Sequence, residues 1–146
     1  MQIQQLGHAV IKVRNQEKAE AFYNGILGLP IAARHPTMPM TFFTLGNHHD
    51  FAILAVGDDA PEASRKSPGL FHVAFKIGET DEDLREAVAH LGANGVAIDA
   101  SIDHTVSKAL YLHDPDGNGI ELYVDASEVW REDPSRVADG RPLVIA

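Results

Sequence analysis

The sequence predicts an α+β fold built from two βαβββ modules, and three observations lead to this prediction. A short motif occurs twice at an offset of 64 residues, as HAVIKV at residues 8–13 and as HVAFKI at residues 72–77. An amphipathic helical pattern follows each copy, and three further short apolar runs follow each helix. The chain therefore divides into two equivalent halves.

Each predicted helix begins with a polar capping residue and is followed by a glycine. Asn15 and Thr80 can cap the helix N-termini, and acidic residues follow them in the first turn, where the helix dipole favours negative charge. Gly28 and Gly92 are expected to end the two helices, because glycine readily adopts the left-handed conformation of a C-terminal cap. The apolar face of the first helix contains Ala19, Phe22, Tyr23, Ile26 and Leu27, and that of the second contains Leu84, Ala87, Val88 and Leu91.

The remaining runs complete the two modules. Strands are expected at residues 31–33, 41–45 and 51–56 in the first half and at 96–98, 109–113 and 119–124 in the second. We expect one domain over residues 1–146, with module one at 1–56, a polar linker at 57–68, module two at 69–126 and a C-terminal arm at 127–146. The irregular arm is expected to be extended, with Trp130 as its anchor.

Composition excludes several classes of function. The chain has 146 residues and no cysteine, so disulfides, thiolate zinc sites and cysteine nucleophiles are ruled out. A net charge of −9 without basic clusters argues against nucleic acid as a partner. The sequence lacks an apolar run of membrane-spanning length and a secretory signal pattern. These features predict a soluble cytoplasmic protein.

Alternation along the predicted strands selects candidate metal ligands. Because successive side chains of a strand point to opposite faces, His8 and His72 lie opposite the apolar residues of their strands. Glu121 lies opposite the apolar residues of the last strand, and Tyr111 occupies the less apolar face of the strand before it. Two imidazoles and one carboxylate form the facial triad that binds non-haem Fe(II) and leaves coordination positions open. The sequence therefore indicates a metal site.

Four sequence segments carry a family resemblance. These are HHDFAI at residues 48–53, FHVAF at 71–75, DHTVS at 103–107 and YLHDPDGNGIELY at 111–123. With them the chain resembles the vicinal oxygen chelate (glyoxalase/bleomycin resistance/dioxygenase) superfamily over residues 6 to 125, and within it the type I extradiol (catechol 2,3-) dioxygenases. The resemblance implies that the paired modules form a cupped, open β-barrel around one metal ion.

The resemblance also implies roles for six residues. His8, His72 and Glu121 correspond to the metal ligands, with Fe(II) as the expected ion and Mn(II) or another divalent metal as alternatives. His49 corresponds to an acid/base residue near the metal, and His104 and Tyr111 to residues that contact the substrate. The implied function is ring cleavage of a catechol-like aromatic by dioxygen, as in aromatic catabolism, by an enzyme that forms a homodimer.

Other interpretations of the same residues stay open. Each histidine taken alone is more often structural than a ligand. The scaffold also occurs in glyoxalase-type lyases and isomerases, which generally add a carboxylate from module one, whereas Ala52 stands at the equivalent position here. A metal-free small-molecule-binding protein of the bleomycin resistance type is a third possibility. The DPDGNG segment at 114–119 is interpreted as a turn and not as a ligand loop.

Overall fold

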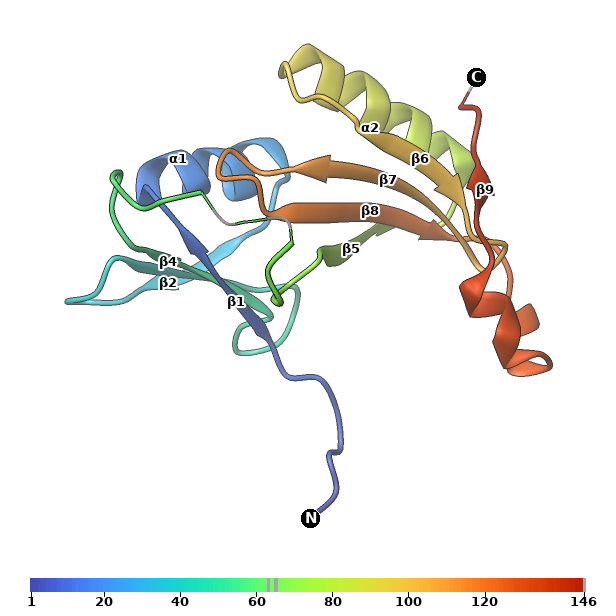
Figure 1. Ribbon diagram of the computed structural model, residues 1–146, viewed down its shortest axis with the longest axis horizontal. Coiled ribbons are helices and arrows are strands. Elements are labelled where there is room, and N and C mark those ends of the chain that lie inside the picture. The colour runs from blue at the N-terminus through green and yellow to red at the C-terminus, as the bar shows by residue number, and fades with distance from the viewer. Residues whose placement is uncertain (63, 65, 146) are drawn as a thin grey trace. The chain divides into compact units, whose positions relative to one another are not determined.

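Two β-sheets, each with a helix packed on it, make up the computed structural model of the protein (Figure 1). The structure describes residues 1–62, 64 and 66–145. Ala63 and Arg65 of the expected linker and Ala146 of the expected arm lie outside the described residues. The chain forms two compact units, Met1–Ser67 with Pro115–Gly117 and Pro68–Asp114 with Asn118–Ala146.

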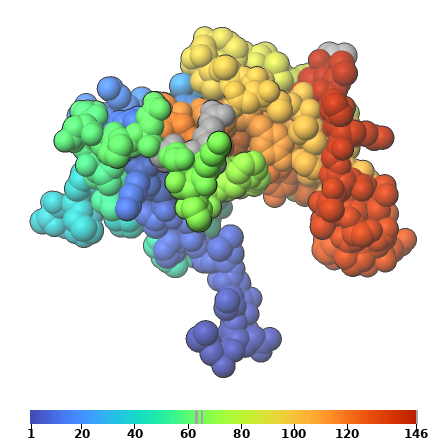
Figure 2. All heavy atoms as spheres, viewed as in Figure 1, coloured from blue at the N-terminus to red at the C-terminus, as the bar shows by residue number. Residues whose placement is uncertain are grey.

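The first unit contains a four-stranded sheet in the order β1-β4-β3-β2. Its elements are β1 (Ala9–Val13), α1 (Gln16–Glu20), the π-helical η1 (Ala21–Ile26), β2 (Ile31–Arg34), β3 (Met40–Phe43) and β4 (Phe51–Ala55). Strands β1 and β4 are parallel and the other pairs are antiparallel. Residues before β1 run outward from the sheet (Figure 2) and include the exposed Ile3 and Leu6.

The second unit repeats this topology and adds a strand from the C-terminal arm. Its elements are β5 (Val73–Gly78), α2 (Asp81–Ala93), β6 (Ala100–Asp103), β7 (Ser107–His113), β8 (Gly119–Asp125), the 3-10 helices η2 (Val129–Arg131) and η3 (Pro134–Ala138), and β9 (Arg141–Pro142). The strand order is β5-β8-β7-β6-β9, with β5 and β8 parallel. The two βαβββ modules confirm the predicted fold class.

Both sheets bury one face under a helix, and in the second sheet strand alternation places polar side chains on the other face, as predicted. In the first unit, Tyr23 of η1 is fully buried and packs on Phe43 and Phe51, with ring centroids 6.1 and 4.9 Å away. In the second unit, α2 packs on β5 and β8 and buries Leu84 and Leu91. The buried face of β8 consists of Ile120, Leu122 and Val124. The opposite face of β8 carries Glu121 and Tyr123, so this face of the second sheet is available for polar side chains.

The end of α2 corrects two predictions. The helix continues through Gly92 to Ala93, and the left-handed residue is Gly95, with a φ of 69°. The N–H of Val96 donates to the carbonyl of Leu91 at 2.9 Å, and the N–H of Gly95 donates to that of Gly92 at 3.1 Å. This pattern is a Schellman motif, so Val96 caps the helix instead of beginning a strand at residues 96–98. The strand of this region is β6, at Ala100–Asp103.

Two further expectations are wrong in detail. The second half of the first predicted helix is π-helical, and the N–H of Leu27 donates to the carbonyl of Phe22 at 2.9 Å. Gly28 has the left-handed conformation expected after that helix, with a φ of 75°. Trp130 is 40% exposed and stacks under Arg131, so it does not anchor the arm by burial.

Within the described residues, no helix is both long and apolar enough to span a bilayer.

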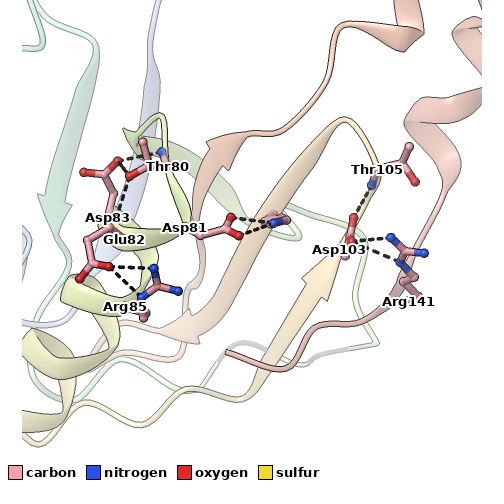
Figure 3. A network of polar contacts seen from close by, with 9 residues as sticks. Thr80, Asp81, Glu82, Asp83, Arg85, Asp103, Thr105 and Arg141 are labelled. Atoms are coloured by element: carbon pink, nitrogen blue, oxygen red, sulfur yellow. Dashed lines mark hydrogen bonds and ion pairs between the residues drawn. The ribbon is translucent and has the colours of Figure 1, made fainter. Parts of the chain in front are cut away.

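The start of α2 is held by a capping box (Figure 3). The Thr80 hydroxyl accepts from the N–H of Asp83 at 3.2 Å, and the Asp83 carboxylate accepts from the N–H of Thr80 at 2.8 Å. The Thr80 hydroxyl also donates to Asp83 and, together with the N–H groups of Glu79 and Thr80, lowers the pKa of that carboxyl. The helix therefore begins at a well-satisfied N-terminus.

We predict that Thr80→Ala lowers the free energy of unfolding by about 1 kcal/mol, because the N–H of Asp83 loses its acceptor. Urea denaturation followed by circular dichroism measures this difference. Thr80→Ser, which keeps the hydroxyl, is the matched control and should stay close to the wild type. Equal stability of the alanine and serine variants would contradict a role for the cap.

Candidate functional site

Three polar side chains lie in one row across the sheet of the second unit. Glu121 of β8 pairs with Ala74 of β5 on one side and with Tyr111 of β7 on the other. His72 immediately precedes β5 and has the same strand parity as Ala74, so it shares the face of Glu121. This face is opposite the buried residues of β8. The register of the sheet therefore brings together three of the predicted site residues.

His72 and Glu121 are in direct contact. The His72 Nε2 atom lies 2.9 Å from the Glu121 Oε2 atom, and the Glu121 residue is buried with an exposure of 9%. Gly119 permits this contact, since a Cβ atom there would collide with the carbonyl oxygen of Phe71 and approach the His72 Cβ within 3.2 Å. A close approach of β5 and β8 thus positions the pair.

The geometry of the pair fits two ligands of one divalent cation. Imidazole nitrogen and carboxylate oxygen atoms bind such ions at roughly 2.0–2.2 Å, so two ligands at right angles stand about 3 Å apart. A proton on Nε2 can hold the pair by a hydrogen bond, and a divalent cation can replace that proton. The Nδ1 atom of His72 is buried and lacks a hydrogen-bond partner among the described residues. Among the described residues, the His72 ring therefore makes its polar contact through Nε2.

His104 contacts the Tyr111 end of this row. The His104 Nε2 atom lies 2.8 Å from the Tyr111 hydroxyl, and the Tyr111 ring lies edge-on to His72 with centroids 5.6 Å apart. Burial, followed by the charge of Glu121 and a hydrogen bond to it, raises the pKa of Tyr111 to about 12. The phenol therefore keeps its proton at neutral pH and can donate a hydrogen bond.

Three histidines form a cluster in the first unit. His8 immediately precedes β1, and its neighbour Ala9 donates its N–H to the carbonyl of Asp50 at 3.2 Å. This pairing brings the His8 ring to 4.1 Å from His49 and 6.4 Å from His48, measured between ring centroids. One ligand atom from each histidine lies within 4.8 Å of the other two. The cluster can supply imidazole ligands to a metal ion.

The loop before β4 sets the direction of the His49 side chain. The Asp50 carboxylate accepts from the N–H groups of Leu45 and Asn47, and His49 packs on Phe42 with ring centroids 5.3 Å apart. Burial, then the neighbouring His8 and His48 rings, lowers the pKa of His49. His48 was given no role from the sequence, although its position directly before His49 in the HHD motif was a usable signal.

The six predicted site residues thus form two groups. His8 and His49 lie together in the first unit, and the second group consists of His72, Glu121, Tyr111 and His104. The assignment of His8, His72 and Glu121 to one ion stays a prediction. The strand registers support the expected equivalence of Ala52 and Glu121. Ala52 pairs with Val10, and Glu121 pairs with Ala74, which stands 64 residues after Val10 in the sequence.

The segment before β8 is a turn, as predicted. The Asp114 carboxylate accepts from the backbone N–H of Asn118 and from its side-chain amide, both at 2.8 Å. Gly117 has a φ of 84°, which glycine adopts without strain. The turn delivers Gly119 and Glu121 to β8 in register with β7.

We predict that Gly119→Ala lowers the free energy of unfolding by about 1–3 kcal/mol, because the added methyl group pushes β5 away from β8. Urea denaturation measures the change. Gly92→Ala is the matched control, since a Cβ atom there meets nothing within 4 Å and alanine favours a helix interior by about 0.5–1 kcal/mol. Equal effects of the two substitutions would contradict a close approach at Gly119.

Curated relatives of the chain include two ring-diol dioxygenases. A catechol-2,3-dioxygenase of Bacillus subtilis is 35% identical over 130 residues, which covers 88% of this chain and 44% of the relative. A biphenyl-2,3-diol 1,2-dioxygenase of Rhodococcus globerulus is 31% identical over 122 residues, covering 82% of this chain and 63% of the relative. The chain thus spans about half to two-thirds of the length of these relatives.

Solved structures and a family model agree on the fold. The crystal structure of a glyoxalase/dioxygenase from Nostoc punctiforme aligns with a TM-score of 0.69 at 21% identity, covering 85% of this chain and 92% of that one. Residues 5–122 match the family model described as Glyoxalase/Bleomycin resistance protein/Dioxygenase superfamily. The chain therefore belongs to the glyoxalase/bleomycin resistance protein/dioxygenase superfamily.

Proposed function

We propose that this protein is an Fe(II)-dependent extradiol-type dioxygenase that cleaves the ring of a catechol-like aromatic. The observation that carries the proposal is the row of His72, Glu121 and Tyr111 on one sheet face, with His104 bonded to Tyr111. The row joins a pair of metal-ligand type to groups that can bind a hydroxylated substrate. The identity to two ring-diol dioxygenases supports the same function.

The proposed metal ligands are His8, His72 and Glu121. The 2.9 Å separation of His72 Nε2 and Glu121 Oε2 and the absence of cysteine both favour a nitrogen and oxygen ligand set. A bound Fe(II) supplies the redox chemistry that couples an aromatic diol to dioxygen. The protein's own contribution is to fix the ligand side chains and to hold the diol beside them.

Tyr111 and His104 are proposed to bind a substrate oxygen. The raised pKa of Tyr111 keeps its hydroxyl neutral at physiological pH, so the group can orient a substrate without adding charge. The His104 ring, 2.8 Å from that hydroxyl, fixes its direction. The Tyr111 hydroxyl, beside Glu121 on the same sheet face, can therefore contact one oxygen of a substrate that the proposed metal ion binds.

His49 is proposed to act as a general base. A catechol must lose protons to bind a cation through both oxygens, and a neutral imidazole can accept one of them. The lowered pKa of His49 favours the neutral ring. Its contact with His8, a proposed ligand, is consistent with a position near the substrate.

The alternative functions have less support. A glyoxalase-type isomerase would need a further carboxylate, and the position equivalent to Glu121 in module one is the buried Ala52. A metal-free binding protein has no need of the His72–Glu121 pair.

We also propose a homodimer, because β1 and β2 are sheet edges that a second copy can cover.

The main test is anaerobic loading with Fe(II), followed by mixing with a panel of catechols in air. We expect a yellow ring-fission product in the visible spectrum. His72→Ala and Glu121→Gln should lose stoichiometric iron and all turnover, because each removes a ligand. His90→Ala, on the exposed surface of α2, is the matched control and should keep both.

Two results would overturn this function. One is the absence of product with every catechol while a glyoxal-derived hemithioacetal is turned over with Ni(II) or Zn(II). The other is full iron content in both the His72→Ala and the Glu121→Gln variants.

We predict that His49→Ala keeps its iron but slows turnover by roughly two to four decades, the usual contribution of a general acid/base. Metal analysis and steady-state kinetics measure the two effects separately. His48→Ala is the control from the same cluster and should change turnover much less. Loss of iron in His49→Ala would instead make His49 a ligand and contradict its role as a base.

A further inference from the structure

The C-terminal arm, defined here as residues 127–145, is fastened to the edge of the second sheet. Strand β9 pairs with β6, with Arg141 opposite Asp103 and Pro142 opposite Ile102. Beyond β9, the Ser101 hydroxyl donates to the carbonyl of Leu143 at 2.7 Å. In the space-filling view the arm is a continuous column of atoms beside β6 (Figure 2). The residues just before β9, Asp139 and Gly140, lie next to the β6–β7 turn that carries His104.

The carboxylate of Asp103 connects the arm to this turn (Figure 3). One oxygen accepts from Nη2 of Arg141 at 2.8 Å, and the other accepts from the N–H of Thr105 at 2.7 Å. The Arg141 guanidinium, followed by the Thr105 N–H, holds the pKa of Asp103 below its ordinary value. Thr105 has a φ of 70°, a conformation that is costly for a β-branched residue. The carboxylate therefore holds a strained turn in place.

His104 lies between the arm and Tyr111. Its Nδ1 atom is 2.7 Å from the carbonyl oxygen of Asp139, and its Nε2 atom is 2.8 Å from the hydroxyl of Tyr111. The arm passes close to the ring at Gly140, where an added Cβ atom would stand 3.7 Å from Nδ1. Both ring nitrogens are thus within hydrogen-bond distance of defined partners.

We propose that the arm is a positioning element that fixes His104 as its Nδ1–H tautomer and leaves Nε2 as an acceptor for the Tyr111 hydroxyl. A carbonyl oxygen can only accept, so the short Nδ1–Asp139 contact requires the proton on Nδ1. A neutral imidazole has one N–H group, so its Nε2 then carries a lone pair. The Tyr111 hydroxyl must therefore be the donor across the 2.8 Å contact.

The tautomer decides where the single proton of Tyr111 points. Glu121 is also a hydrogen-bond acceptor for that hydroxyl. With Nε2 as an acceptor, His104 draws the proton away from Glu121 and leaves the carboxylate free for a cation. The lone pairs of the Tyr111 oxygen can then accept from a hydroxyl of the incoming substrate before that hydroxyl gives up its proton. The roles of Glu121 toward a cation and of Tyr111 toward a substrate rest on the proposed function, but the tautomer of His104 does not.

The test is NMR of the full chain labelled with ¹⁵N-histidine, because ring nitrogen shifts distinguish the two tautomers. In the wild type we expect the Nδ1–H form of His104, assigned by the signal that His104→Gln removes. The double variant Ser101→Ala/Arg141→Ala loses the hydrogen bond from Ser101 to Leu143 and the ion pair of Arg141 with Asp103. In this variant, the ratio of the Nδ1–H form to the Nε2–H form of His104 should fall about tenfold. The matched control Arg131→Ala alters the arm away from Asp103 and should keep the wild-type signal.

Two outcomes would overturn the proposal. One is a wild-type His104 in the Nε2–H form, a measurement that needs no variant to fold. The other is an unchanged tautomer in a folded double variant whose arm is released, shown by fast amide exchange at Leu143. A wild-type Nδ1–H signal in a protein that turns over no catechol would instead refute the proposed function and leave this inference standing.

Discussion

The parallel pairing of β5 with β8 is the constraint on which the candidate site depends. Its register places Ala74 opposite Glu121, and alternation then brings His72 onto the same face. Only glycine at position 119 allows the strands to approach closely enough for the 2.9 Å contact between His72 and Glu121. Antiparallel pairing of β7 with β8 adds Tyr111 from the other side. A backbone feature therefore selects which side chains meet.

Much of the fold could be predicted because it is repeated. The 64-residue offset identified two equivalent modules, and period-two alternation identified the polar face that carries Glu121 and Tyr111. The errors concern contacts made outside the local pattern. Gly92 resembles a helix stop, but the Schellman bonds form three residues later at Gly95, and they take Val96 away from a strand. Such cooperative capping is not visible in composition or periodicity.

The candidate site was predicted less completely than the fold. Alternation could select the face of His72, but it could not indicate that His8, His48 and His49 cluster, because two of these residues lie in a loop that Asp50 organises. The link between His104 and the arm was equally inaccessible, since Asp139 contributes a backbone carbonyl, which every residue possesses. Trp130 was a misleading signal, because large aromatics usually mark buried anchors and this one is 40% exposed.

The alanine at position 52 restricts how this scaffold can change its chemistry. Its side chain is wholly buried, with Val10 and Phe42 as its cross-strand neighbours. A glutamate introduced there would place an ionised group among apolar neighbours at a cost of several kcal/mol, unless a cation neutralised it. The duplicated halves thus differ at this position, and a single Ala52→Glu substitution would be tolerated only together with a bound cation.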